Sequence, residues 1–454
     1  MNTALLPMTQ RRLDRRAATL QAEGRIPSLV TGLVRDCGLV WSAARGTLPA
    51  GVDPLALQYR IGSITKTFVA VAVLQLRDAG KVRLTDPIET YVPGTLFADR
   101  TVAHLLTHTG GIAAELPGSW WERAPGVDRE DLHTALGQGT VLDRPGRHVH
   151  YSNIAFAVLG ELVSRVSGRA WDEVIDQQVL APLQMQRTTA LPQSPFAAGY
   201  AVHPYADVLL PEKVQDTGAM APAGQLWSTV ADLGRWAAFL AGDTGGVLDS
   251  DTLAEMCEPA AVADDVEFSS GRGLGVQLYR ENGRRLVGHG GSMPGFQAGV
   301  RVHRESATGI VVVMNCTTPG KVADLEDPFD VLEECEPRLP EPWVAQPSVP
   351  ASLLELTGSW FWGTSEGTVR VLEQGWLKLE HVSGMTTTSR FRPAGTDTWT
   401  GLDGYFRGET LRVVRAGDGT AEHLDIGTFV FTRRPYQPGE IIPGGMDDGG
   451  WPTT

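Results

Sequence analysis

Apolar and polar positions change their period several times along the first 335 residues of the chain. Short apolar runs at 33–34 and 38–41 predict a hairpin that begins a sheet. Apolar residues then recur at helical spacing, which predicts helices over 63–80, 101–109, 153–167, 171–180 and 228–241. Ser228 is the predicted N-cap of the last helix, and strand-like runs between 286 and 315 predict consecutive antiparallel strands. Strands on both sides of a helical stretch predict an α+β domain whose sheet joins its two ends.

The pattern changes after a proline-rich stretch at 336–350, which reads as a linker because proline interrupts helices and strands. Beyond it, seven or eight short alternating runs with glycine turns predict a small antiparallel barrel. We therefore divide the chain into a first domain over 1–335, the linker, a barrel over 351–436 and a flexible tail over 437–454.

The composition is that of a globular protein, with 42% hydrophobic and 20% charged residues in a chain of 454. A net charge of −14 and a pI near 5.2 argue against nucleic acid or an anionic membrane as a partner. The N-terminus lacks the apolar core of a signal peptide, and no segment approaches the roughly 20 apolar residues that span a bilayer. We therefore expect a cytoplasmic protein. The four cysteines have no paired spacing, which indicates reduced thiols.

Candidate chemistry begins at Ser63 and Lys66, which precede an unbroken apolar run at 68–74. The run predicts a buried helix with Ser63 in its first turn, where residues three apart share a face, so the amine can reach the hydroxyl. Burial and the helix N-terminus both disfavour a lysine cation, which lowers the pKa of Lys66 toward that of a general base. The alternative is that Ser63 only caps the helix.

Tyr151 and Asn153 lie in a predicted loop and at the start of the following helix. A tyrosine there could relay a proton to a leaving group, and a nearby lysine ammonium would lower the pKa of the phenol. Asn153, two positions later, points the same way. The alternative is a loop tyrosine that packs and forms hydrogen bonds.

Glycines surround His289 on a predicted strand, and glycines within strands usually permit a close approach of backbone or ligand. Backbone N–H groups of this strand, together with that of Ser63, could bind an oxyanion, and His289 could supply a donor or a switchable charge. The alternative is a half-buried histidine on an edge strand. Separately, His104 and His108 have a spacing that could hold a metal, but no third ligand is in reach.

The serine–lysine, tyrosine–asparagine and histidine–glycine strings occur in an order that resembles the penicillin-binding-protein and class C β-lactamase superfamily. The resemblance implies a β-lactamase-like fold and acyl-serine chemistry. Ser63 would attack a carbonyl and Lys66 would take its proton. Tyr151 would act as base or relay, and Asn153 would bind the amide side of the substrate. The N–H groups of Ser63 and Ser292 would hold the oxyanion, and no metal or organic cofactor is implied.

The third motif departs from the usual Lys-Thr-Gly, because this chain has His289, Gly290 and Gly291. The change weakens the case for penicillin hydrolysis. The strings at 291–296 and 225–233 resemble the penicillin-binding-protein-type thioesterases, which carry a lipocalin-like barrel and release nonribosomal peptides as macrolactams. This implies a peptidyl thioester with a D-residue at its acyl end, delivered by a peptidyl carrier protein. The alternatives are an esterase or D-stereospecific aminopeptidase or amidase, and a non-catalytic peptide-binding protein.

Overall fold

The chain forms two compact units, Met1–Arg338 and Leu339–Thr454. The computed structural model describes residues 4–95, 97–136, 140–264, 266–317, 327–340, 342–381 and 388–437. The boundary between the units falls in the proline-rich segment, which has no helix or strand after residue 335 in its described part. The tail predicted over 437–454 lies outside the described residues except for its first position.

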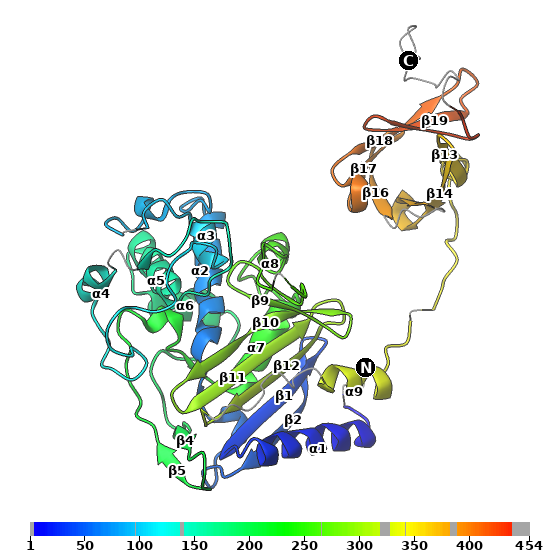
Figure 1. Ribbon diagram of the computed structural model, residues 1–454. Coiled ribbons are helices and arrows are strands. Elements are labelled where there is room, and N and C mark those ends of the chain that lie inside the picture. Colours follow the sequence, from blue (N-terminus) through cyan, green and yellow to red (C-terminus); the bar gives the residue numbers. More distant parts are fainter. Residues whose placement is uncertain are drawn as a thin grey trace. The chain divides into compact units, whose positions relative to one another are not determined.

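The first unit is built on an eight-stranded antiparallel sheet in the order β2-β1-β12-β11-β10-β9-β8-β7 (Figure 1). Its strands are β1 (Ser28–Arg35), β2 (Gly38–Gly46), β7 (Ala261–Val262), β8 (Ser270–Arg272), β9 (Gln277–Glu281), β10 (Arg284–Met293), β11 (Phe296–His303) and β12 (Thr308–Met314). The first strand pairs with the last, with Leu29 opposite Met314. The prediction that the sheet joins both ends of this domain is confirmed.

Helices cover both faces of the sheet. On one face, α1 (Pro7–Glu23) and α9 (Asp327–Cys335) contribute apolar residues to a small core (Figure 1). On the other, α7 (Val230–Ala241) belongs to a larger core that continues into a helical layer. That layer contains α2 (Thr65–Asp78), α3 (Val102–Leu106), α4 (Arg129–Ala135), α5 (Asn153–Ser167) and α6 (Trp171–Ile175), and α8 (Ser250–Met256) follows α7 along the chain.

The central helix α5 has the bounds that its pattern predicts. Ser152 caps its N-terminus by accepting from the N–H of Ala155, and Gly168 ends it with a left-handed φ of 71°. The predicted cap of α7 is wrong, because Ser228 belongs to a two-stranded pairing of β3 (Tyr59–Arg60) with β6 (Trp227–Ser228). Thr229 takes the capping role by accepting from the N–H of Asp232.

One other predicted helix is shorter than expected, because only 102–106 of the stretch 101–109 is helical. The helix predicted over 171–180 is present, but α6 continues at 176–180 as a wider π turn. The hairpin of β4 (Tyr200–Val202) with β5 (Leu209–Pro211) completes the unit. None of the described helices is both long and apolar enough to cross a membrane.

The second unit is a closed barrel of eight antiparallel strands. They are β13 (Gly358–Trp362), β14 (Ser365–Val371), β15 (Leu377–His381), β16 (Ser389–Gly395), β17 (Thr398–Gly401), β18 (Thr410–Arg415), β19 (Ala421–Ile426) and β20 (Phe429–Thr432). Large apolar side chains such as Trp360 and Phe391 fill its core. The predicted barrel is confirmed, and closure removes the exposed strand edges that an open sheet would have.

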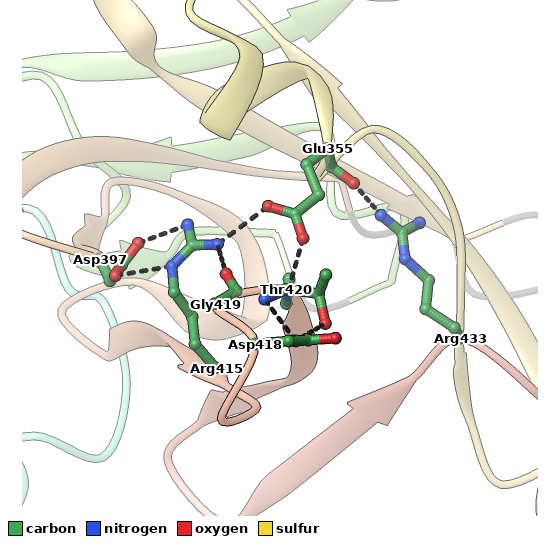
Figure 2. Close-up of polar contacts among 8 residues, drawn as sticks. Glu355, Asp397, Arg415, Asp418, Gly419, Thr420 and Arg433 are labelled. Carbon is green, nitrogen blue, oxygen red and sulfur yellow. Dashed lines mark hydrogen bonds and ion pairs between the residues drawn. The ribbon is translucent and has the colours of Figure 1, made fainter.

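A polar cluster ties the segment before the barrel to a hairpin within it. The helical turn α10 (Ala351–Leu354) precedes Glu355, whose carboxylate accepts from Arg415 at 2.8 Å. Figure 2 shows the guanidinium of Arg415 between Glu355 and Asp397, with two further hydrogen bonds of 2.8 and 2.9 Å to Asp397. Arg433 donates to the carbonyl of Glu355 and lies over the ring of Trp360 at 3.8 Å. These contacts fix the first and last strands to the same turn.

Candidate active site

Ser63 lies in a short 3₁₀ turn, Gly62–Ile64, immediately before α2, rather than within the helix as expected. The turn packs closely on β10, because a side chain at Gly62 would come within 2.5 Å of the backbone nitrogen of Ser292. Gly62 also has a φ of +52°, which other residues rarely adopt. The side chain of Ser63 remains partly exposed and so can meet a substrate.

Lys66 is completely buried one turn later. Its amine lies 3.0 Å from the Ser63 hydroxyl, 2.7 Å from Oδ1 of Asn153 and 2.5 Å from the carbonyl oxygen of Ala223. Burial lowers the pKa of Lys66 to about 7, against the opposing effect of the Glu115 carboxylate. A neutral amine that donates to both carbonyl oxygens keeps its lone pair for the Ser63 proton. The contacts therefore suit a general base.

The phenol of Tyr151 lies near Ser63, whose hydroxyl acts to lower the pKa of Tyr151. The ring stacks on His108 with centroids 4.4 Å apart, and the amine of Lys66 lies 5.0 Å from the ring centroid. The expected lowering of the Tyr151 pKa is wrong, because burial raises that pKa above its ordinary value. A lysine whose own pKa falls to about 7 is only partly charged at neutral pH and gives a phenolate little support. Tyr151 is therefore a neutral phenol that can relay a proton.

Asn153 is the first residue of α5, and its amide links two sides of the site. Oδ1 accepts from Lys66, whereas Nδ2 donates to Oε1 of Glu115 at 2.6 Å. The second oxygen of Glu115 accepts from the indole N–H of Trp121 at 2.5 Å. Glu115 lies in an irregular segment and Ala223 ends a short 3₁₀ turn, Ala221–Ala223, so no sequence motif predicts either contact.

His289 is buried on β10, which lies between β9 and β11 and is not an edge strand. Burial and the neighbouring Lys66 hold the pKa of His289 well below its ordinary value. The imidazole is therefore neutral at physiological pH, and the expectation of a switchable charge is wrong. Its Nδ1 is hydrogen bonded to the carbonyl of Gly290.

The edge of β10 opens toward Ser63. The strand pairs with β11 through Met293, but with β9 only as far as Gly288. Gly291 is needed where the strand passes the serine turn, since a side chain there would come within 1.9 Å of the carbonyl of Ile61. No other group lies within 4 Å of the position that a Cβ atom at residue 290 would occupy. Position 290 therefore has room for a larger side chain.

The N–H groups of Ser63 and Ser292 are the donors predicted for an oxyanion. Ser292 is two positions after Gly290, so both N–H groups point to the same edge of the strand. The N–H of Gly290 donates to Oε1 of Gln277 at 3.2 Å. The contact of Gly62 with Ser292 brings the N–H of Ser292 beside the serine turn, which suits an oxyanion hole.

The two histidines of the 101–109 segment have structural roles. His104 accepts from the N–H of Thr101 and completes a capping box at α3. His108 accepts from the N–H of Ser152 at 3.1 Å and supports the ring of Tyr151. Among the described residues, no group of three or more histidine, cysteine, aspartate or glutamate side chains could hold a metal ion.

Comparison with known proteins finds similar chains in several organisms. Penicillin-binding protein 4 of Amycolatopsis lactamdurans is 27% identical over 340 residues, which cover 70% of this chain and 87% of that protein. Beta-lactamase-like protein 2 of Dictyostelium discoideum is 25% identical over 304 residues, 63% of this chain, but the match spans only 55% of the Dictyostelium protein.

Solved structures share the fold. SurE, whose structure is also known with D-Leu, has a TM-score of 0.60 and 22% identity, and the match covers 94% of this chain and 99% of SurE. The D-amino acid amidase of Ochrobactrum anthropi SV3 has a TM-score of 0.64 and 19% identity over 72% of this chain and 98% of the amidase.

Family models divide the chain much as the structure does. A domain of unknown function matches 349–433, which contains the barrel. The beta-lactamase family matches 13–333, which contains the sheet, the helical layer and the serine–lysine pair. The chain therefore belongs to the beta-lactamase family and has the fold of its serine hydrolases.

Proposed function

We propose that this protein is an acyl-serine thioesterase that takes a linear peptidyl thioester and releases it as a head-to-tail macrolactam. The observation that carries the proposal is the combination of Ser63 and Lys66 with a neutral His289 and open space at Gly290. A neutral imidazole lacks the permanent cation that would pair with a substrate carboxylate. The arrangement favours a leaving group without a carboxylate, such as a thiol.

The reaction has two acyl transfers. In the first, Ser63 Oγ attacks the thioester carbonyl, its proton passes to Lys66, and the thiolate leaves and takes a proton relayed through Tyr151. In the second, the peptide's own N-terminal amine attacks the ester of Ser63. The amine gives up a proton, Ser63 regains one, and an amide forms without consumption of water. The bound amine must outcompete solvent, which requires a high effective concentration near the ester.

The acyl end of the substrate is proposed to be a D-residue. SurE has been solved with D-Leu, and another neighbour is named as a D-amino acid amidase. The edge of β10 beyond Gly288 gives an extended peptide a strand to lie against, which would present its carbonyl to the predicted oxyanion donors. A peptidyl carrier protein of a nonribosomal peptide synthetase is the proposed source of the thioester.

A second candidate is hydrolysis by the same site, as an esterase or a D-stereospecific aminopeptidase or amidase. The partly exposed Ser63 favours it, because water that reaches the ester would compete with the amine.

The deciding experiment incubates the full chain with a synthetic linear peptide thioester ending in a D-residue and follows products by mass spectrometry. Cyclisation gives a product one water lighter than the linear acid and is the expected result. Linear acid as the sole product across several peptides would contradict the cyclase and support the hydrolase. The S63A variant should lose either activity. A complete absence of Ser63-dependent turnover and of a covalent adduct with β-lactam probes would favour a binding protein.

A further inference from the structure

The hydrogen bonds around Asn153 form a chain with a single allowed direction. The indole N–H of Trp121 can only donate, and the carboxylate of Glu115 can only accept. Glu115 accepts from Trp121 through Oε2 and from Asn153 through Oε1. The amide of Asn153 must therefore present its nitrogen to Glu115 and its oxygen to Lys66.

We propose that Glu115 is a positioning residue that holds the amide of Asn153 with its oxygen toward the amine of Lys66. The inference rests on the role of Ser63 as nucleophile in the proposed function, but not on whether an amine or water accepts the acyl group. Glu115 touches neither Ser63 nor the reacting atoms, so it acts through Asn153.

The direction of the amide matters because Lys66 has only one lone pair when neutral. With Oδ1 of Asn153 and the carbonyl of Ala223 as acceptors, both N–H bonds of the amine are used and the lone pair faces Ser63. An amide turned by half a rotation would offer N–H groups to Lys66 instead. The lone pair of Lys66 could then accept a hydrogen bond from Asn153, and it would no longer be available to take the proton of Ser63.

Glutamine at position 115 cannot replace glutamate in this chain. Trp121 and Asn153 face different oxygens of Glu115, and the amide of glutamine has an oxygen in only one of these two positions. In E115Q, if the glutamine oxygen faces Trp121, the glutamine NH₂ group faces Asn153. This favours the orientation in which the Asn153 amide is turned and its nitrogen faces Lys66. The W121F substitution removes the indole N–H that needs an acceptor, so the glutamine oxygen can accept from Asn153 instead. The double variant E115Q/W121F should therefore recover the orientation that E115Q loses.

The negative charge of Glu115 has a second effect, on the pKa of Lys66, which can be measured separately from its effect on the orientation of Asn153. The titratable groups around Lys66 are two carboxylates, two imidazoles and a phenol, namely Glu115, Glu122, His108, His289 and Tyr151. The imidazoles are neutral, since burial and Lys66 hold their pKa values well below the ordinary value, and burial keeps the phenol protonated. Glu115 raises the pKa of Lys66, so its loss moves the acidic limb of the rate to lower pH. That shift should persist in E115Q/W121F.

The experiment measures the rate at which a fluorophosphonate labels Ser63 in the full chain between pH 5.5 and 9. Labelling forms a bond from Ser63 Oγ to phosphorus, releases fluoride and passes the serine proton to Lys66, so it reports the base without any acyl acceptor. We expect E115Q to label about tenfold to a hundredfold more slowly than wild type. W121F is the matched control and should stay within about threefold.

The double variant decides between positioning and a merely structural role. E115Q/W121F should label faster than E115Q and approach the rate of W121F. The acidic limb of its pH profile should remain shifted to lower pH. E115D keeps two accepting oxygens and should label faster than E115Q, which provides a second comparison. Equal rates for E115Q and wild type, or a double variant no faster than E115Q, would overturn the inference. A wild-type chain without Ser63-dependent labelling would overturn the proposed function itself.

Discussion

Replacing Lys66 with methionine should change how the stability of the first unit depends on pH. Methionine keeps an unbranched stem and removes the buried amine. In the folded chain burial lowers the pKa of Lys66 from 10.5 to about 7, and unfolding restores the ordinary value. Between these values the unfolded state binds one more proton than the folded state. The contribution of Lys66 to the free energy of unfolding therefore rises with pH across this window and is lowest below about pH 7.

The magnitude follows from the size of the shift. One pKa unit corresponds to about 1.4 kcal/mol, so the drop from 10.5 to about 7 amounts to about 5 kcal/mol over the whole window. Between pH 7 and pH 9 the wild type should gain about 2 kcal/mol relative to K66M. The loss of hydrogen bonds to Asn153 and Ala223 adds an offset to K66M that does not vary with pH.

Urea titrations of both chains at pH 7, 8 and 9, followed by circular dichroism, measure this difference. K213M, which removes an exposed lysine, is the control and should run parallel to the wild type. The same group should produce an acidic limb near pH 7 in kcat/KM, because only neutral Lys66 accepts the serine proton. Wild-type and K66M stabilities that stay parallel within about 0.5 kcal/mol would refute the assignment of a depressed pKa to Lys66.

Three further substitutions test other parts of the structure. G291A places a methyl group within 1.9 Å of the carbonyl of Ile61, so it should displace the serine turn and lower acylation by about a hundredfold, measured by probe labelling. G290T meets open space, so its melting temperature should match the wild type, and a large drop in calorimetry would contradict the open site. R415M removes the bonds to Asp397 and should destabilise the barrel by about 2 kcal/mol. Hydrogen exchange should then rise in peptides of the barrel while the first unit is unchanged.

Local pattern was sufficient to predict the elements that carry the nucleophile. The apolar run after Lys66 predicts a buried helix, and α5 has its predicted bounds because Ser152 and Gly168 are strong caps at either end. The closed barrel was predicted from short alternating runs, although the charged strand β19 has little apolar pattern of its own. These features depend on neighbours in sequence, which is why a single chain reveals them.

The electrostatic part of the site could not be predicted in the same way. Glu115 contacts Asn153, and the carbonyl of Ala223 contacts Lys66, only through the packing of segments distant in sequence, so no spacing identifies them. The pKa of Tyr151 is raised rather than lowered, because the phenol is buried and Lys66 is a weaker cation than an ordinary lysine, and neither property is visible in the motif. Proximity can be read from a motif, but desolvation depends on the whole core.

The pairing of β1 with β12 has a consequence for how the protein is made. Leu29 cannot meet Met314 until almost all of the first unit has been synthesised. At about 5 to 20 residues per second, β1 leaves the ribosome tens of seconds before its partner strand. One edge of β1 can pair early with β2, but the other has no partner during that time. Contacts so distant in sequence also slow folding, so the nascent sheet is exposed to aggregation until β12 arrives.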